Sequence, residues 1–226
     1  WLVRNNDKTG PDVEGKITEF VTVSDCRVSR FLDVGIELSG ASHCAVTNCV
    51  ISGDGNTSGT ILGAAIEIWN GSQWNVVSNC TIRGDSGSSR VTAWRMDPYA
   101  DANTAVRKTA FNLITGCVAY NVQHGFRSFT NGSARTEDAE LVNCRAYGMG
   151  TANGVGALIV AMNRVRLRGC TFENFDHTLR VSAPGDISNQ LTVGALTVTE
   201  CTLATYDGGT GAEIYVHAAS EATFAH

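Results

Sequence analysis

Eight cysteines are the most evident candidates for chemistry in this 226-residue sequence. Cysteines can form disulfides, bind zinc as thiolates, or pack as small buried apolar side chains. Seven of them stand in near-copies of one phrase, such as "AVTNCVISG" around Cys49, "VVSNCTIRG" around Cys80 and "ELVNCRAYG" around Cys144. The sequence holds no short CxxC pair, which argues against a zinc site. The repeat therefore reflects either the chemistry of the cysteines, as in a disulfide or metal framework, or a repeated unit of the fold.

The residues around each repeated cysteine favour the fold. An apolar residue stands three positions before it, at Val23, Val46, Val77, Ile114, Leu141, Leu167 and Val198. Another stands two positions after it, at Val28, Ile51, Ile82, Ala119, Ala146, Phe172 and Leu203. The residue immediately before it is mostly Asp, Asn or Gly, which tolerate a left-handed backbone. Each unit therefore predicts a strand, a one-residue corner and a second strand.

The cysteines themselves are predicted to point inward and to stack on one another from coil to coil. Cys44 falls on the same inward parity as Val46. Side chains that project in parallel do not favour the dihedral angle of a disulfide, so we expect reduced packing thiols.

A third strand precedes each later unit. The spacing between repeated cysteines runs from 23 to 37 residues, as in a solenoid whose loops vary in length. The third strands are expected at 34–39, 64–69, 92–97, 125–130, 156–161, 178–182 and 213–217. The sequence therefore predicts an all-β solenoid of about seven coils with three short strands each.

This pattern resembles the right-handed parallel β-helix, or pectin-lyase-like, superfamily of pectate lyases, polygalacturonases and phage tailspikes. The resemblance implies one single-stranded parallel β-helix domain over residues 1–226. It lies in the repeat, because the Asn-Thr-Asp and Arg-Ile-Lys motifs of polygalacturonases and the Asp-His strand signature of pectate lyases are missing. Tailspikes and related polysaccharide depolymerases, which share little common motif, are the closer match in style.

Longer loops flank the third strand of each coil. They are expected before it at 53–63, 84–90 and 148–156, and after it at 98–109, 131–138 and 183–190. The outer face of this sheet is therefore predicted to be the floor of a groove. Alternation along the strands directs a row of polar and aromatic side chains outward. The row holds Glu37, Glu67, Arg95 with Asp97, Arg127, an apolar residue near Leu158, Arg180 and Tyr215; Trp69 shares the parity of Glu67, and His124 precedes a floor strand.

The carboxylates of this row are the predicted catalytic residues. Glu37 and Glu67 occupy equivalent places on neighbouring coils, and glycoside hydrolysis uses two such carboxyls. Mutual repulsion would raise the pKa of one of them. Asp97 is a third candidate, expected at a greater distance.

The predicted substrate-binding residues are arginines, aromatics and a histidine, which suit an acidic polysaccharide. Arginine forks hold carboxylates or sulfates, and aromatic rings stack on sugars. This set comprises Trp69, Arg95, His124, Arg127, Arg180 and Tyr215. A lyase would use the arginines to neutralise a uronate beside a base. The row could instead be a ladder of charge pairs that keeps the sheet solvated.

Composition limits the partners. The formal charge of −5, with only three lysines, argues against a nucleic-acid or anionic-membrane surface. No segment approaches a membrane span, and no metal or cofactor is expected. Neither end looks like a cap, so we expect a fragment of a longer chain, neighbouring domains, or a homotrimer that covers the ends.

Two functions fit these residues. The first is a polysaccharide-binding and polysaccharide-degrading β-helix, extracellular or on a virion surface, that works as a tailspike-type depolymerase, glycoside hydrolase or lyase. The second is a non-catalytic structural or receptor-binding module of a virion or surface appendage.

Overall fold

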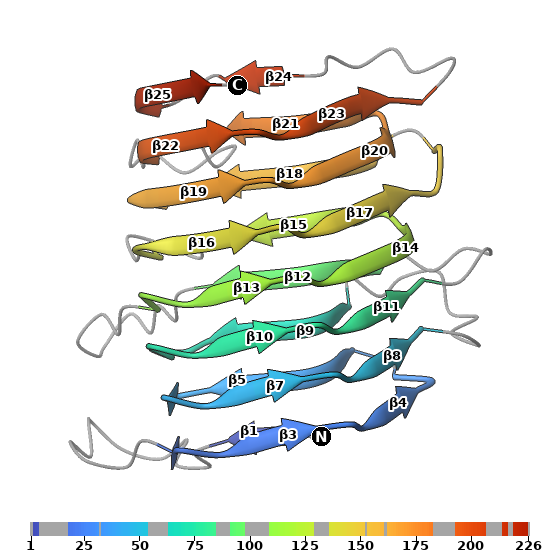
Figure 1. Ribbon diagram of the computed structural model, residues 1–226, viewed down its shortest axis with the longest axis vertical. Coiled ribbons are helices and arrows are strands. Elements are labelled where there is room, and N and C mark those ends of the chain that lie inside the picture. The colour runs from blue at the N-terminus through green and yellow to red at the C-terminus, as the bar shows by residue number, and fades with distance from the viewer. Residues whose placement is uncertain are drawn as a thin grey trace.

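The chain folds as a parallel β-solenoid in the computed structural model (Figure 1). The structure describes residues 2–4, 18–31, 33–53, 63–84, 91–97, 109–128, 136–151, 153–160, 162–182, 193–206, 214–216 and 219–225. Strands nearer the viewer in Figure 1 run to the right, those behind run to the left, and the chain rises with each turn. This is the sense of a right-handed coil. The predicted fold class is therefore confirmed.

Three parallel sheets carry almost all the strands of the described residues. The first sheet, which corresponds to the predicted third strands, contains eight: β1 (Leu2–Arg4), β5 (Val34–Ser39), β9 (Ala64–Trp69), β12 (Thr92–Asp97), β15 (His124–Ser128), β18 (Val155–Val160), β21 (His177–Ser182) and β24 (Ile214–Val216). The second sheet, before the cysteine corners, also contains eight: β3 (Thr22–Ser24), β7 (Ala45–Thr47), β10 (Val76–Ser78), β13 (Leu113–Thr115), β16 (Ala139–Val142), β19 (Arg164–Arg168), β22 (Val193–Thr199) and β25 (Ala219–Ala225).

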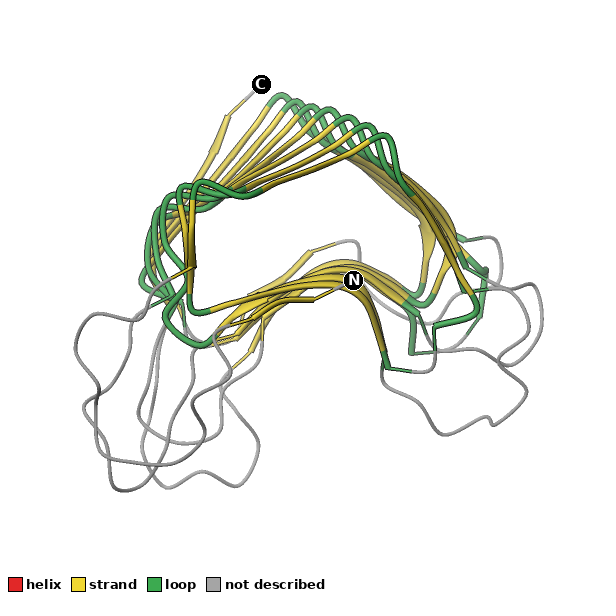
Figure 2. Ribbon diagram, turned by 90° about the horizontal axis from the view of Figure 1, so that it is seen from below, coloured by secondary structure: helices red, strands yellow, loops and turns green. Residues whose placement is uncertain are grey.

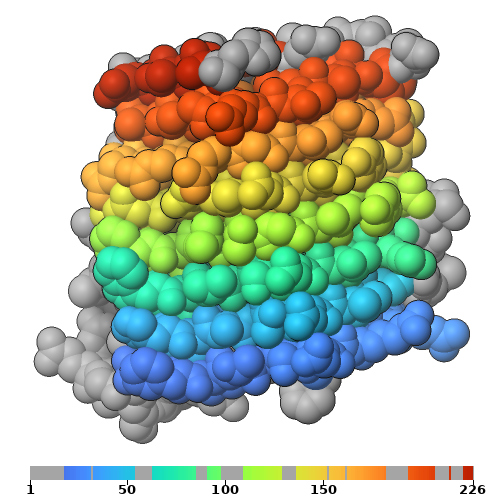
Figure 3. All heavy atoms as spheres, in the orientation of Figure 1, coloured from blue at the N-terminus to red at the C-terminus, as the bar shows by residue number. Residues whose placement is uncertain are grey.

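The third sheet follows the corners and contains seven strands: β4 (Arg27–Ser29), β8 (Val50–Ser52), β11 (Thr81–Arg83), β14 (Val118–Val122), β17 (Arg145–Gly148), β20 (Thr171–Phe175) and β23 (Thr202–Thr205). A short pair, β2 (Thr18–Glu19) and β6 (Ala41–Ser42), completes the described strands. Figure 3 shows the second and third sheets from outside, where successive coils form parallel bands. The described residues contain no helix long and apolar enough to cross a membrane.

The one-residue corners lie where the cysteine phrases predict them. A positive φ is found immediately before each repeated cysteine, at Asp25, Asn48, Asn79, Gly116, Asn143, Gly169 and Glu200. Asn, Asp and Gly adopt this left-handed conformation most readily, so the local sequence specifies each bend. The bends turn the chain from the second sheet into the third.

The seven repeated cysteines form a column inside the solenoid, and Cys44 is buried separately, before β7. All eight are free, and only Cys26 and Cys201, in the first and last coils of the column, are partly exposed. Each repeated thiol donates to the carbonyl two residues earlier, as Cys49 does to Thr47 at 3.3 Å and Cys80 to Ser78 at 3.3 Å. This shared orientation fits parallel packing of small apolar side chains.

We expect the buried thiols to resist labelling in the folded protein. Burial raises the pKa of Cys49, and the thiolate is the reactive form of a cysteine. Titration with Ellman's reagent should therefore modify Cys26 and Cys201 first and the others only after denaturation in urea. If all eight thiols reacted at once in the native protein, or if too few were found after unfolding, the packing assignment would be wrong.

Strict alternation fails near the start of the first-sheet strands. A Cβ added to Gly125 would meet Ala146 and Phe172, and one added to Gly156 would meet Phe172, so both positions face the core. The next residue of β15, Phe126, is also wholly buried. Two consecutive inward positions bend each strand, and Figure 2 shows this sheet bowing toward the interior at its middle.

Candidate functional site

The predicted outward row exists as one continuous column on the first sheet. Strand pairing aligns consecutive coils in the order Glu37, Glu67, Arg95, Arg127, Leu158, Arg180 and Tyr215. A neighbouring column, two residues further along the strands, aligns Ser39, Trp69 and Asp97. Parallel pairing without a register shift places these residues on adjacent strands, although they are far apart in the sequence.

An ion cluster forms the centre of this column. The Arg95 Nη2 atom lies 2.7 Å from Glu67 Oε1, and its Nε donates to Asp97 Oδ2 at 2.6 Å. Glu67 and Asp97 are only 4% and 6% exposed, so a single guanidinium contacts two buried carboxyl groups. Charge-assisted hydrogen bonds of this kind fix geometry strongly.

Burial raises the pKa of Glu67 to about 7 despite this contact. Desolvation of the charged form is the largest cause; Arg95 opposes it, while Asp97 and Glu37 add to it. For Arg95, burial alone would lower the pKa, but the charges of Asp97 and Glu67 outweigh it and raise the value. Glu67 therefore keeps a proton at mildly acidic pH while Arg95 remains charged, as a general acid requires.

The three candidate carboxylates make different contacts. Asp97 raises the pKa of Glu67 more than Glu37 does, and it shares the Arg95 guanidinium with Glu67. Glu37 instead accepts a hydrogen bond of 2.6 Å from the Trp69 indole. Because Asp97 sits two residues beyond Arg95 on the same face of β12, one side chain of that strand can bridge to the other.

The remaining predicted binding residues are spread along the column. Arg127 adjoins Arg95, and burial lowers its pKa. Leu158 packs against Val160 in a small apolar cluster outside the main core, and it separates Arg127 from the exposed Arg180. The column therefore carries charged side chains of both signs at the Glu37 end and an apolar side chain, Leu158, in the middle.

Two predicted binding residues lie apart from the ion cluster. Tyr215 pairs with Arg180 at the end of the sheet, and the structure describes only its backbone. His124 belongs to another column, opposite Thr92 and Val155, about 10 Å along the strand from Arg127. That position sets His124 apart from the Glu67 cluster, and its side chain is buried.

The predicted groove walls fall largely outside the described residues. Of the six loop segments named from the sequence, 54–62, 85–90, 98–108, 131–135, 152 and 183–190 are not described. Among the residues that are described, no three His, Cys, Asp or Glu side chains converge on a candidate metal site.

The stability of the protein should fall as the pH rises from about 4.5 to about 7. The folded state holds the Glu67 proton up to a pKa of about 7, whereas the unfolded chain releases it near 4.5, so the folded state binds more protons in this window. The loss should be on the order of 3 kcal/mol. Urea unfolding of the wild type and of Glu67→Gln between pH 4.5 and 8 measures it. The variant should lack this slope, and equal slopes in the two proteins would contradict the assignment.

Sequence reasoning missed a second set of side chains, on the corner before the second sheet. There the rings of Phe20, His43, Trp74 and Phe111 follow one another along the solenoid. All four have a positive φ, as the cysteine corners do. A repeat search centred on these corners would have found them, since each stands two residues before a second-sheet strand.

Comparisons with known proteins agree with this fold. A family model described as "Right handed beta helix region" matches residues 4–105. No curated protein matches the sequence. The solved structure titled "Crystal structure of Agl-KA catalytic domain" is similar, with a TM-score of 0.50 and 9% identity over 92% of this chain. The chain spans 42% of that chain, and at this identity the likeness concerns the fold alone.

The chain is therefore a right-handed parallel β-helix, as its repeat predicted. The closer likeness to phage tailspikes stays a prediction.

Proposed function

We propose that this protein binds and cleaves an acidic polysaccharide that lies across the outer face of the first sheet. The observation that carries the proposal is the pairing of Glu67, whose pKa burial raises to about 7, with a second carboxylate on the same guanidinium. One carboxyl that keeps its proton beside another that is ionised is the arrangement that glycoside hydrolysis needs.

The proposed chemistry assigns Glu67 as the general acid. Its carboxyl proton passes to the glycosidic oxygen as the bond from that oxygen to the anomeric carbon breaks. Asp97 or Glu37 either takes a proton from the attacking water or attacks the anomeric carbon itself. In the first case the water oxygen forms the new bond to the anomeric carbon and the carboxylate takes its proton. In the second case the carboxylate oxygen forms that bond, and a water molecule later hydrolyses the resulting ester, with deprotonated Glu67 taking the proton of that water.

Positive charge along the same column supports an acidic substrate. Arg127 follows Arg95 directly, and Arg180 lies beyond the apolar Leu158. A polymer laid along the column would place its anionic groups near the arginines and its apolar faces near Leu158 and Trp69. A homotrimer and an extracellular or virion-surface location belong to the same proposal.

The test is a screen of bacterial capsular and plant acidic polysaccharides against the whole chain. Size-exclusion chromatography follows chain length, reducing-end release reports cleavage, and ultraviolet absorbance of an unsaturated product identifies a lyase. We expect shortening of at least one acidic polymer without the unsaturated product. Detection of the unsaturated product would instead show that the polymer is cleaved by elimination, as in a lyase.

A non-catalytic role is the second candidate, and one observation favours it. Glu67 and Asp97 are almost wholly buried and already paired with Arg95, as in a structural ion cluster. This candidate predicts binding of a polysaccharide with no fall in chain length in the same screen. Neither binding nor shortening of any acidic polymer would reject the proposed function.

A further inference from the structure

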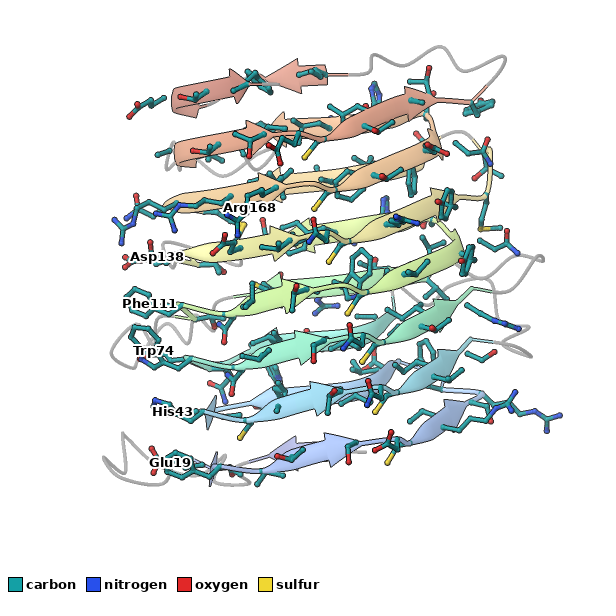
Figure 4. All side chains as sticks on the ribbon, viewed as in Figure 1. Glu19, His43, Trp74, Phe111, Asp138 and Arg168 are labelled. Carbon is teal, nitrogen blue, oxygen red and sulfur yellow. The ribbon has the colours of Figure 1, made fainter. Side chains whose placement is uncertain are left out.

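A column of aromatic corners runs along the edge of the second sheet. Strand register aligns Phe20, His43, Trp74, Phe111 and then Asp138 on five consecutive coils. Figure 4 shows four labelled members, His43, Trp74, Phe111 and Asp138, one above another along this edge. We call the four rings, Phe20, His43, Trp74 and Phe111, the aromatic column. It is separate from the Glu67 cluster, which belongs to the first sheet.

The backbone does not explain why rings occupy these corners. Phe20, His43, Trp74 and Phe111 have φ between 54° and 58°. Bulky side chains are disfavoured in this region, and Asn serves the same conformation at the cysteine corners, as Asn48 does with φ of 55°. The rings therefore carry a conformational cost that the bend itself does not require, and such costs tend to persist where the side chain has a role.

Stacking between the rings accounts for part of this choice. The centroids of Trp74 and Phe111 lie 4.1 Å apart with an interplanar angle of 8°, and His43 stacks on Trp74 at 6.4 Å. The column of rings ends at Phe111, because the next corner residue is Asp138. Phe111 and Trp74 remain 39% and 49% exposed. Stacking therefore leaves aromatic surface open to solvent at the Phe111 end.

A cavity of about 310 Å³ lies at this end of the column. Its lining combines the rings of Trp74 and Phe111 with Leu113 and with the charged residues Asp138, Glu140 and Arg166. Ligand sites typically combine apolar surface with a few polar groups, and their volumes begin at about 300 Å³. The space is therefore of the size that suits a small ring rather than a long chain.

The polar groups are held in position. Arg164 donates to both carboxylate oxygens of Asp138, and this contact lowers the pKa of Asp138, so the carboxylate stays ionised. Arg168 Nη2 lies 3.7 Å from Glu140 Oε1. The lining thus offers carboxylate acceptors at Asp138, on the corner before β16, and at Glu140 on β16, and a donor, Arg166, on β19.

We propose that this cavity binds one neutral pyranose ring of an oligosaccharide. The apolar C–H face of the sugar would lie against Phe111, and its hydroxyl groups would bond to Asp138, Glu140 and Arg166. Both acidic groups that line the cavity are carboxylates, so they would repel a uronate carboxylate placed against them, and Arg164 and Arg168 offset part of that repulsion. This preference is opposite to that of the arginine-rich first sheet, and the proposal does not depend on cleavage at Glu67.

The test compares binding of defined sugars by isothermal titration calorimetry. The probes are maltohexaose and cellohexaose as neutral ligands, hexagalacturonate as an acidic one, and choline as a cation. The protein is the full chain carrying Glu67→Gln, so that no probe is cleaved. We expect a neutral hexasaccharide to bind and the variant Phe111→Asn to weaken it at least tenfold. Asn suits the left-handed corner, so this variant removes the ring without disturbing the bend.

A matched control uses the other exposed ring stack in the described residues, Tyr120 on Tyr147, with centroids 5.4 Å apart. Tyr120→Ala should leave the affinity within twofold, and circular dichroism should show that both variants are folded. The proposal is overturned if no neutral hexasaccharide binds, if Phe111→Asn binds it as well as the parent, or if choline alone binds in a Phe111-dependent way. If hexagalacturonate binds and Phe111→Asn does not change its affinity, we assign that binding to the first sheet. This outcome bears only on the proposed function.

Discussion

Glu67→Gln should lower the rate of cleavage of the acidic glycan by about 10² to 10⁴-fold, while the fold is retained. Glutamine keeps the size of the side chain but has no proton to give to the glycosidic oxygen. The expected loss is in kcat, because arginines of the column such as Arg127 still hold the substrate. Reducing-end release from a polysaccharide found in the screen measures the effect, and circular dichroism checks the fold.

Glu173→Gln is the matched control for this substitution. Glu173 lies on the outer face of the third sheet, in register with Tyr147, and has no part in the proposed site. Its replacement should leave the rate within twofold. A Glu67→Gln protein as active as the wild type would reject Glu67 as the acid. Residual activity that shows the wild-type pH profile would point to another proton donor.

Arg95→Met should be the most destabilising change on the outer face of the first sheet, at about 3–5 kcal/mol near neutral pH. Methionine fills similar space but leaves Glu67 and Asp97 buried with the charge of Arg95 removed. Without that charge, the pKa of Glu67 should rise further, since Arg95 is what lowers it now. Much of the lost stability should therefore return as the pH falls to about 5 and the carboxyls bind protons.

Urea unfolding of Arg95→Met at pH 7.5 and pH 5 measures both effects. Arg168→Met removes an exposed partner of Glu140, 3.7 Å away, and should change the free energy of unfolding by less than about 1 kcal/mol. If Arg95→Met were equally mild, or if its stability did not recover at acidic pH, the buried ion cluster would not contribute as the structure indicates.

Much of the fold can be predicted from this sequence because a solenoid repeats one local rule. An apolar residue, a left-handed corner and an inward cysteine recur around Cys80 as they do around the other six repeated cysteines. Each coil therefore provides independent evidence for the same register of inward and outward residues. That register also predicts the outward row from Glu37 to Tyr215, which strand pairing reproduces residue by residue.

The period-two rule fails where geometry depends on neighbouring coils. Gly125 and Phe126 both face the core, because the sheet bends there and glycine lets the strand approach the carbonyl oxygen of Gly156. His124 was assigned to the site because it precedes a floor strand, and the strand pairing places it in another column. The pattern of one strand does not show that Phe172, from another sheet, lies against both Gly125 and Gly156.

The sequence by itself determined the coil, its corners and the order of residues along each face, because these depend on local backbone preferences and on which side chains avoid water. Only the tertiary structure decided which charges meet. Arg95 binds Glu67 and Asp97 together, Trp69 holds Glu37, and Phe111 ends a column of rings beside Asp138. Such contacts depend on side-chain rotamers and on burial shared between coils, and they set the pKa of Glu67, on which the proposed chemistry rests.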